Sequence, residues 1–252
     1  MRNIDLNCDM GEAFGIYQFG ADLEIIKSIS SANIACGWHA GDPMVMDSRV
    51  KLCADHGVAV GAHPGFPDLL GFGRRNIVCS PAEVKSYILY QVGALLAFTK
   101  SNGIVMSHVK AHGNLYNMAA IDYKMARAIA EAVYDLDSEL VLVGLANSQF
   151  VKAGHDVGIR VAEEIFADRA YQANGNLVPR TEPNAVFHSI EQAVQRIVEL
   201  VEQGTLTAID GTKIVTKGDT ICLHGDTAGA ADFAREVRQN LEARGIELKP
   251  LR

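Results

Sequence analysis

Five of the chain's eight histidines stand where predicted β-strands end, and histidine is the side chain best suited to proton transfer and metal binding near neutral pH. They lie in short clusters rich in Gly, Asp, Asn or Lys, and they are His39, His63, His108, His112 and His224. Histidines that only filled a core would not fall so regularly at one point of a repeating unit. Their placement predicts an enzyme with its active site at the strand ends.

Carboxylates occupy the first predicted strand in an alternating pattern. Asp5, Asn7 and Asp9 are two residues apart, so a strand would point all three to one side. Burying such groups without partners is costly, which favours a functional reading over a solvated strand start.

A second alternating set combines imidazole with ammonium. His108, Lys110 and His112 would share one face of a strand. A buried lysine is either neutral and basic or cationic beside a carboxylate such as Asp5 or Asp9. The set therefore predicts acid–base or electrostatic chemistry.

Other candidates have competing structural explanations. Arg74 and Arg75, in a Gly-Phe-Gly-Arg-Arg segment, could hold a carboxylate or phosphate or could be solvated arginines of a surface turn. Asp168 and Arg169 could bind substrate or form a structural ion pair, and Asp226 could cap the last helix. The thiols Cys8 and Cys36 stand near the expected site, but nothing in their local sequence would lower a thiol pKa.

The elements that must position these groups alternate along the chain. Seven short apolar runs are typical of strands buried in a parallel sheet: Ile4–Asn7, Ala32–Cys36, Val58–Ala62, Val105–Val109, Leu140–Val143, Val161–Phe166 and Thr220–Leu223. Helical patterns lie between them, at about Asp22–Ser30, Pro43–His56, Pro81–Asn102, Asp122–Leu136, Ser148–Ala153, Ile190–Gln203 and Ala230–Ala243. We predict one α/β domain over residues 1–252, a regular or distorted barrel, with ligands at the carboxyl ends of its strands.

Composition excludes several classes of function. The net charge of −7, without a Lys/Arg block, argues against nucleic acid as a partner. Five cysteines without a CxxC pair fit a reducing compartment. The N-terminus is not a signal peptide and no apolar run could span a membrane, so we expect a soluble cytoplasmic protein. P-loop, G-x-S-x-G and H-E-x-x-H motifs are absent.

Taken together, the clusters resemble the LamB/YcsF family over essentially the whole chain. The resemblance rests on Asp5–Glu12, Asn33–Gly37, His39–Pro43, Gly61–Gly65, Asp68, Gly71–Arg75, His108–Lys110, His112–Gly113, Leu115–Asn117, Phe166–Arg169 and His224–Asp226. Ala111 and Asn114 depart from the family pattern, and neither change removes a titratable group.

The resemblance implies a distorted seven-stranded (β/α) barrel, similar to the glycoside hydrolase/deacetylase fold. It also implies ATP-dependent cleavage of 5-oxo-L-proline to L-glutamate by a 5-oxoprolinase, in which this chain would be the A subunit and subunits B and C its partners. ATP, with Mg²⁺, would then be bound largely through those partners, because this chain has no recognisable nucleotide motif.

Within that chemistry we expect Asp9 or His63 to activate water and Lys110 to stabilise charge on oxygen. His112 or His224 would protonate the leaving nitrogen. The expected substrate-binding residues are Asp5, Asn7, His39, Arg74, Arg75, His108, Asp168, Arg169 and Asp226.

Two other functions remain open at this point. The first is a stand-alone metal-dependent deacetylase or amidase, acting on a carbohydrate or small amide, with Asp9, His39 and His63 as metal ligands. The second is a non-enzymatic carrier that holds a ligand for a partner. The chain could also form a homo-oligomer.

Overall fold

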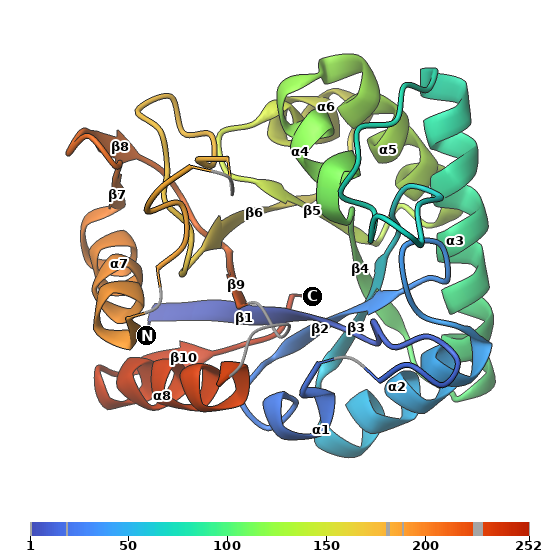
Figure 1. The fold of residues 1–252 in the computed structure, drawn as a ribbon, viewed down its shortest axis with the longest axis horizontal. Helices are drawn as coiled ribbons and strands as arrows, with labels where there is room; N and C mark the ends of the chain where they lie inside the picture. The colour runs from blue at the N-terminus through green and yellow to red at the C-terminus, as the bar shows by residue number, and fades with distance from the viewer. Residues whose placement is uncertain (1, 19, 180–181, 188, 224–228, 252) are drawn as a thin grey trace.

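A computed structural model describes residues 2–18, 20–179, 182–187, 189–223 and 229–251. Seven parallel strands close into a barrel, in the order β1-β2-β3-β4-β5-β6-β9, with β9 pairing back onto β1 (Figure 1). The strands are β1 (Arg2–Met10), β2 (Ser31–Ala35), β3 (Ala59–His63), β4 (Met106–Lys110), β5 (Val141–Leu145), β6 (Val161–Phe166) and β9 (Thr220–Leu223). The predicted seven-stranded α/β barrel is confirmed.

Helices surround the barrel and cover the outer face of its sheet (Figure 1). They are α1 (Asp22–Ile25), α2 (Pro43–His56), α3 (Pro81–Ser101), α4 (Gly113–Ile121), α5 (Tyr123–Leu136), α6 (Gln149–Val157), α7 (Ile190–Gln203) and α8 (Ala230–Ala243). Side chains cap two of these helices: Ser80 and Glu83 form a reciprocal capping box at α3, and the Asp42 side chain accepts from two backbone N–H groups at the start of α2.

Three predictions of local structure were wrong. The helix expected over Asp22–Ser30 ends at Ile25, because the chain must turn to place Ser30 under β1, where its N–H binds the Leu6 carbonyl. His112 was expected on the same strand as His108 and Lys110, but β4 ends at Lys110 and an unpredicted helix, α4, begins at Gly113, whose φ of +56° lets the chain turn directly into it. Finally, α6 continues to Val157, four residues beyond its predicted end.

Three short strands were not predicted. β7 (Thr205–Thr207) and β8 (Lys213–Val215) form an antiparallel hairpin after α7. β10 (Ile246–Leu248) adds in parallel to the beginning of β1. The hairpin lies in the long segment between β6 and β9.

The two faces of β1 have opposite character, and this sets up the site. Ile4, Leu6 and Cys8 point outward into the hydrophobic core between sheet and helices. The alternating residues point into the barrel, whose interior is therefore polar rather than aliphatic. None of the helices in the described part of the chain combines the length and apolar composition that a membrane crossing requires.

Candidate active site

The barrel interior begins with a buried carboxylate at its amino-terminal end. Asp5 accepts hydrogen bonds from the hydroxyls of Ser30 (2.7 Å), Ser31 (2.6 Å) and Thr220. Burial raises the pKa of Asp5 to about 6, against the lowering effect of these hydroxyl donors. Asp5 therefore belongs to the floor of the barrel.

A layer of amide and imidazole groups lies above Asp5. The Asn33 side-chain amide donates to Asn7 Oδ1 and to Asp9 Oδ1, both at 2.8 Å, and Asn33 Oδ1 lies 2.8 Å from His108 Nε2. Burial, followed by the charge of Lys110, lowers the pKa of His108 to about 3, so this ring is neutral. Gly61 makes the layer possible, because a Cβ there would overlap the His108 ring.

Lys110 joins this layer to the top of the barrel. Its Nζ lies 2.8 Å from Glu164 Oε1, 3.0 Å from Asp9 Oδ1 and 3.2 Å from Asn7 Oδ1. Burial alone would lower the pKa of Lys110, but the neighbouring carboxylates raise it well above the usual range. The Tyr116 hydroxyl donates a 2.7 Å hydrogen bond to the other oxygen of Glu164, Oε2. Lys110 is thus a buried ammonium, not the neutral base that the sequence also allowed.

Asp9 is the carboxylate that links this network to the solvent-facing end. Although burial would raise its pKa, His63 and Lys110 hold the pKa of Asp9 well below the usual value. Its Oδ1 is occupied by Asn33 and Lys110, while Oδ2 lies 3.2 Å from His63 Nε2. Asp9 is therefore an ionised carboxylate with one oxygen directed at the histidines.

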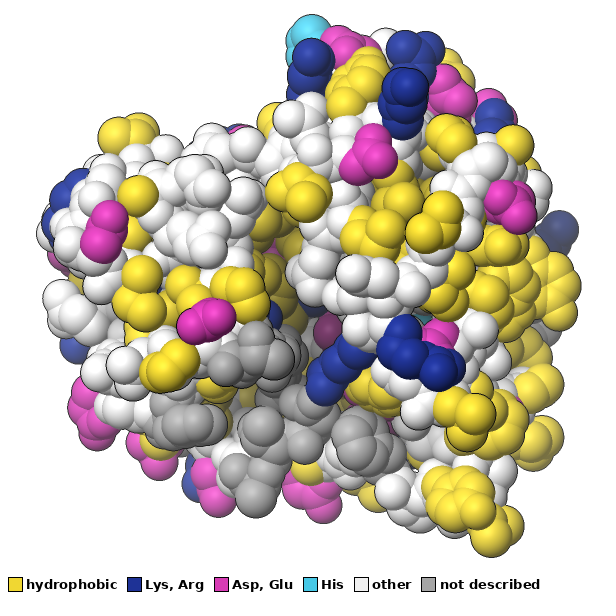
Figure 2. Space-filling view, turned by 45° about the horizontal axis from the view of Figure 1, so that its top comes forward, with side chains coloured by type: hydrophobic (Ala, Val, Ile, Leu, Met, Phe, Trp, Pro, Cys, Tyr) yellow, Lys and Arg dark blue, Asp and Glu magenta, His cyan; other side chains and the backbone are white. Residues whose placement is uncertain are grey.

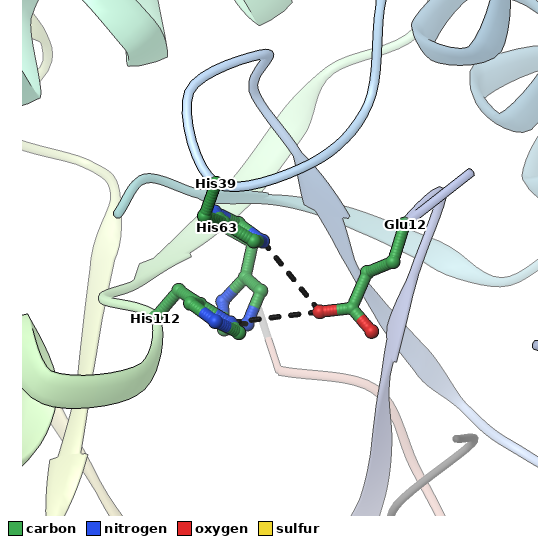
Figure 3. Close-up of side chains that lie close together, drawn as sticks. All are labelled: Glu12, His39, His63 and His112. Carbon is green, nitrogen blue, oxygen red and sulfur yellow. Dashed lines mark hydrogen bonds and ion pairs between the residues drawn. The ribbon is translucent and has the colours of Figure 1, made fainter. Parts of the chain in front are cut away.

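Three histidines and Glu12 gather at the carboxyl ends of β1, β2, β3 and β4 (Figure 3). One potential ligand atom from each residue lies within 4.8 Å of those of the others. The closest approach is His112 Nδ1 to His63 Nε2, at 3.0 Å, and Glu12 Oε1 lies 3.5 Å from both His112 Nδ1 and His39 Nε2. These are the described residues that could together hold a metal ion, and the set differs from the predicted Asp9, His39 and His63.

His39 is the most unusual member of the cluster. Its ring is fully buried and stacks on His112 with centroids 3.6 Å apart and planes 1° from parallel. Neither ring nitrogen has a hydrogen-bond partner among the described residues. Burial first, and then His112 and His63, lower the pKa of His39 well below its usual value, and burial lowers that of His112 to about 3.

A cavity of about 760 Å³ opens onto this end of the barrel. Its lining includes Asp9, Glu12, His63, Lys110, His112, Arg74 and Arg169. Figure 2 shows the corresponding hollow in this face of the molecule, with acidic and basic side chains at its edge. The volume suits a small-molecule ligand.

The remaining predicted site residues are distributed as follows. Asp5, Asn7, His39, His108 and Asp168 are not among the residues that line the cavity. Arg75 forms an ion pair with Asp68 in the loop after β3, so its guanidinium is committed there. Arg169 lines the cavity while donating to the Val178 carbonyl at 2.7 Å. His224 and Asp226 lie outside the described residues.

Sequence reasoning missed Glu12, Asn33 and Glu164. Glu164 could have been found, because it alternates with Phe166 on a strand that must be buried on both faces. Glu12 follows Gly11 at φ +71°, a turn beyond the strand, which no alternation rule reaches. Conversely, a thiol nucleophile is not supported, since burial raises the pKa of Cys36 to about 12 and that of Cys8 well above 9.0.

The fold and site together define a closed parallel α/β barrel with a polar, titratable cavity at the carboxyl ends of its strands, which is where enzymes of this architecture bind substrate. The chain belongs to the LamB/YcsF family, whose profile matches residues 4–252.

Two curated relatives are similar over almost the whole chain. A protein of Bacillus subtilis (strain 168) is 52% identical over 98% of this chain and 96% of its own length. A protein of Tolumonas auensis (strain DSM 9187 / NBRC 110442 / TA 4) is 53% identical over 100% of both chains. Both are named as the A subunit of 5-oxoprolinase. The crystal structure of a lactam utilization protein from Thermus thermophilus superimposes with a TM-score of 0.93 at 45% identity, covering 98% of this chain and 99% of that one.

Proposed function

We propose that this chain is the A subunit of an ATP-dependent 5-oxoprolinase and opens the lactam ring of 5-oxo-L-proline to give L-glutamate. The observation that carries the proposal is the convergence of Asp9 and Lys110 on a cavity of small-molecule size, in a chain about half identical to relatives with that name. The reaction is the hydrolysis of a cyclic amide.

The energetic problem of this reaction is the resonance of the amide. Transfer of a phosphoryl group from ATP to the lactam oxygen would make the ring carbon electrophilic and convert the oxygen into a leaving group. Water would add to that carbon, and cleavage of the carbon–nitrogen bond with protonation of the nitrogen would give γ-glutamyl phosphate. Hydrolysis of this acyl phosphate by a second water would release phosphate and leave L-glutamate. The sequence holds no P-loop motif, so we assign nucleotide binding, with Mg²⁺, largely to the partner subunits B and C.

Of the two bases expected to activate water, Asp9 is better placed than His63. The Asp9 side chain is 17% exposed, and that of His63 only 1%. Lys110, held between Asp9 and Glu164, supplies positive charge close to where negative charge develops on the carbonyl oxygen. Arg74 and Arg169 at the cavity wall are placed to bind the substrate carboxylate or a phosphoryl group.

Of the two histidines expected to protonate the ring nitrogen, His112 is neutral, because burial lowers its pKa to about 3, and its N–H faces the Phe72 carbonyl. We therefore assign this proton to His224, which lies outside the described residues. All five cysteines are free, which supports the expected cytoplasmic location of the reaction.

Reconstitution tests this proposal. The purified chain, alone and with subunits B and C, is incubated with 5-oxoproline and ATP, and glutamate is measured. We expect glutamate only when all components are present, and we expect Asp9→Asn to lower kcat about 10²–10⁴-fold. Asp55→Asn, an exposed carboxylate on α2, is the matched control and should leave kcat unchanged. Glutamate formation by the chain alone without ATP would overturn the proposal.

A second candidate function is favoured by one observation, the cluster of Glu12 with three histidines. It is a metal-dependent amidase or deacetylase that acts without ATP. The same reconstitution separates the two, because this function predicts hydrolysis of a small amide by the chain alone, lost on chelation and restored by a divalent ion.

A further inference from the structure

The histidine cluster contains a contact that neutral side chains cannot make favourably. His63 Nδ1 lies 2.8 Å from the Lys110 carbonyl oxygen, and His112 Nε2 lies 2.8 Å from the Phe72 carbonyl oxygen. A carbonyl only accepts, so each of these nitrogens carries the ring's N–H. When both rings are neutral, the remaining nitrogens, His63 Nε2 and His112 Nδ1, carry lone pairs, and these two atoms face each other at 3.0 Å.

Negative charge surrounds the same point. Glu12 Oε1 lies 3.5 Å from His112 Nδ1, and Asp9 Oδ2 lies 3.2 Å from His63 Nε2. Two lone pairs and two carboxylate oxygens at this separation repel one another unless a proton or a metal ion lies between them. Lys110 does not meet this need, since its ammonium is engaged by Asp9 Oδ1, Glu164 and Asn7 on the other side of Asp9.

His39 supplies an independent observation. It is a fully buried imidazole whose two nitrogens lack hydrogen-bond partners among the described residues, an arrangement that costs free energy. Its Nε2 lies 3.5 Å from Glu12 Oε1, on the same side as the ligand atoms of the other two histidines (Figure 3).

The backbone around these rings is shaped to admit them. A Cβ on Gly65 would lie 2.7 Å from His39 Nδ1, and a Cβ on Gly73 would lie 2.7 Å from His112 Cδ2. The loop that carries both glycines is fixed to the cluster by hydrogen bonds from His112 N to Pro64 O and from Asn114 N to Gly73 O. The rings are thus held in place before any ligand arrives.

We infer that Glu12, His39, His63 and His112 bind one divalent transition-metal ion. Three imidazole nitrogens and one carboxylate, without thiolate, suit Zn²⁺, Mn²⁺, Fe²⁺, Co²⁺ or Ni²⁺ better than Mg²⁺ or Ca²⁺, which prefer oxygen ligands. The spacing of 3.0–3.5 Å between neighbouring ligand atoms is that of donors about 2.0–2.2 Å from a common ion. The carbonyl partners of His63 and His112 are the outer contacts that orient imidazole ligands in such sites.

The position of the ion relative to the cavity gives it a chemical use. Glu12, His63 and His112 line the cavity, whereas His39 closes the site from behind. An ion there would offer Lewis acidity beside the ionised Asp9. It would also engage the free nitrogens of His63 and His112, leaving Asp9 as the base of the described set. The metal site itself does not depend on the proposed lactam reaction.

Metal binding by the purified full chain tests the inference without any substrate. After chelation and dialysis, the chain is titrated separately with Zn²⁺, Co²⁺, Ni²⁺ and Mn²⁺, and the bound ion is counted by elemental analysis. We expect one ion per chain for at least one of these metals. X-ray absorption of the wild-type complex should show nitrogen and oxygen ligands at about 2.0–2.2 Å with the scattering pattern of imidazole.

Variants then assign the ligands. His39→Gln and Glu12→Gln should each weaken binding at least about tenfold. His155→Gln, on a surface histidine whose side chain is 90% exposed, should bind as tightly as wild type. The wild-type absorption spectrum remains decisive if a ligand variant fails to fold. A folded wild-type chain that takes up none of the four metals stoichiometrically, a spectrum without imidazole, or His39→Gln binding as wild type would each overturn the inference.

Discussion

Substitution of Lys110 tests both the contribution of its charge to stability and the contribution of its charge to activity. Its ammonium is buried between Asp9 and Glu164, so Lys110→Met keeps most of the aliphatic stem but leaves two carboxylates without their cation. Glu164 is fully buried, which means that water cannot replace the lost charge. We expect the variant to be both unstable and inactive.

The magnitude follows from the two distances. At an effective dielectric constant of about 20, charges 2.8–3.0 Å apart attract by about 5–6 kcal/mol each. The variant loses this attraction, but it also avoids the cost of burying an ammonium, which is several kcal/mol and offsets most of the loss. Breaking a buried ion pair on one side lowers the free energy of unfolding by about 3–5 kcal/mol, and we expect a loss in that range.

A double variant distinguishes the two roles. Lys110→Met with Glu164→Gln removes the cation and one of its carboxylates together, so it should recover part of the lost stability while activity stays about 10²–10³-fold below wild type. Urea unfolding and glutamate formation with subunits B and C measure the two effects. Lys85→Met, whose ion pair with Asp135 is on the surface, is the matched control and should change stability by less than about 1 kcal/mol. A loss below about 1 kcal/mol in Lys110→Met would refute the argument from burial, and retained activity in the double variant would refute the role of the charge.

Two further predictions concern the interior of the barrel. The pKa of Asp5 is about 6 in the folded state against 3.8 unfolded, so its contribution to stability is fully present below pH 3.8 and is lost as the pH rises through 6. Between pH 5 and 8 this loss amounts to about 1.4 kcal/mol. The free energy of unfolding, measured with urea at both pH values, should therefore decrease less in Asp5→Asn than in the wild type. An equal decrease in the two proteins would contradict the raised pKa of Asp5. Gly61→Ala places a Cβ against the His108 ring and should lower the free energy of unfolding by about 1–3 kcal/mol, whereas Gly93→Ala, in open space within α3, should leave it unchanged or raise it by up to about 1 kcal/mol. Equal stability of the two alanine variants would show that the barrel gives way at Gly61.

The barrel was predictable because each of its strands carries a strong local signal. Apolar runs, helix caps such as Ser80 with Glu83, and glycines after helices are properties of short windows of sequence. The elements that were missed have weaker signals. β7, β8 and β10 are three residues each, and their pairing partners are decided by tertiary contacts. The beginning of α4 was hidden by polar residues that serve the site rather than the helix.

The sequence predicted which side chains point into the barrel, but not how far along the barrel axis each of them lies. Alternation tells which residues of a strand face the barrel interior, and it placed Asp5, Asn7 and Asp9 correctly on one face. It does not tell how far along the axis each residue lies, because this depends on the stagger between neighbouring strands. Asp5 and His108 therefore turned out to lie beneath the cavity.

For adjacent residues in loops, the sequence did not show which side chain would point to the site. Arg74 lines the cavity, while Arg75 turns to Asp68 and is committed to an ion pair. Loop backbone has no fixed period, so the direction of each side chain is set by partners that come from elsewhere in the chain. Glu12 is a second example, since only the turn at Gly11 brings it to the histidines.

The electrostatics of the barrel interior explain why its side chains alone are not sufficient to hydrolyse an amide. The same neighbours that make burial of Asp9 tolerable, His63 and Lys110, also lower its pKa and make it a weak base. A weak base cannot take a proton from ordinary water at a useful rate while an unactivated amide is attacked. The substrate must be made more electrophilic or the water more acidic. Phosphorylation of the lactam oxygen by partner subunits would achieve the first, and a metal ion at Glu12, His39, His63 and His112 would achieve the second. Both proposals therefore follow from one physical constraint, the cost of keeping Asp9 ionised inside the barrel.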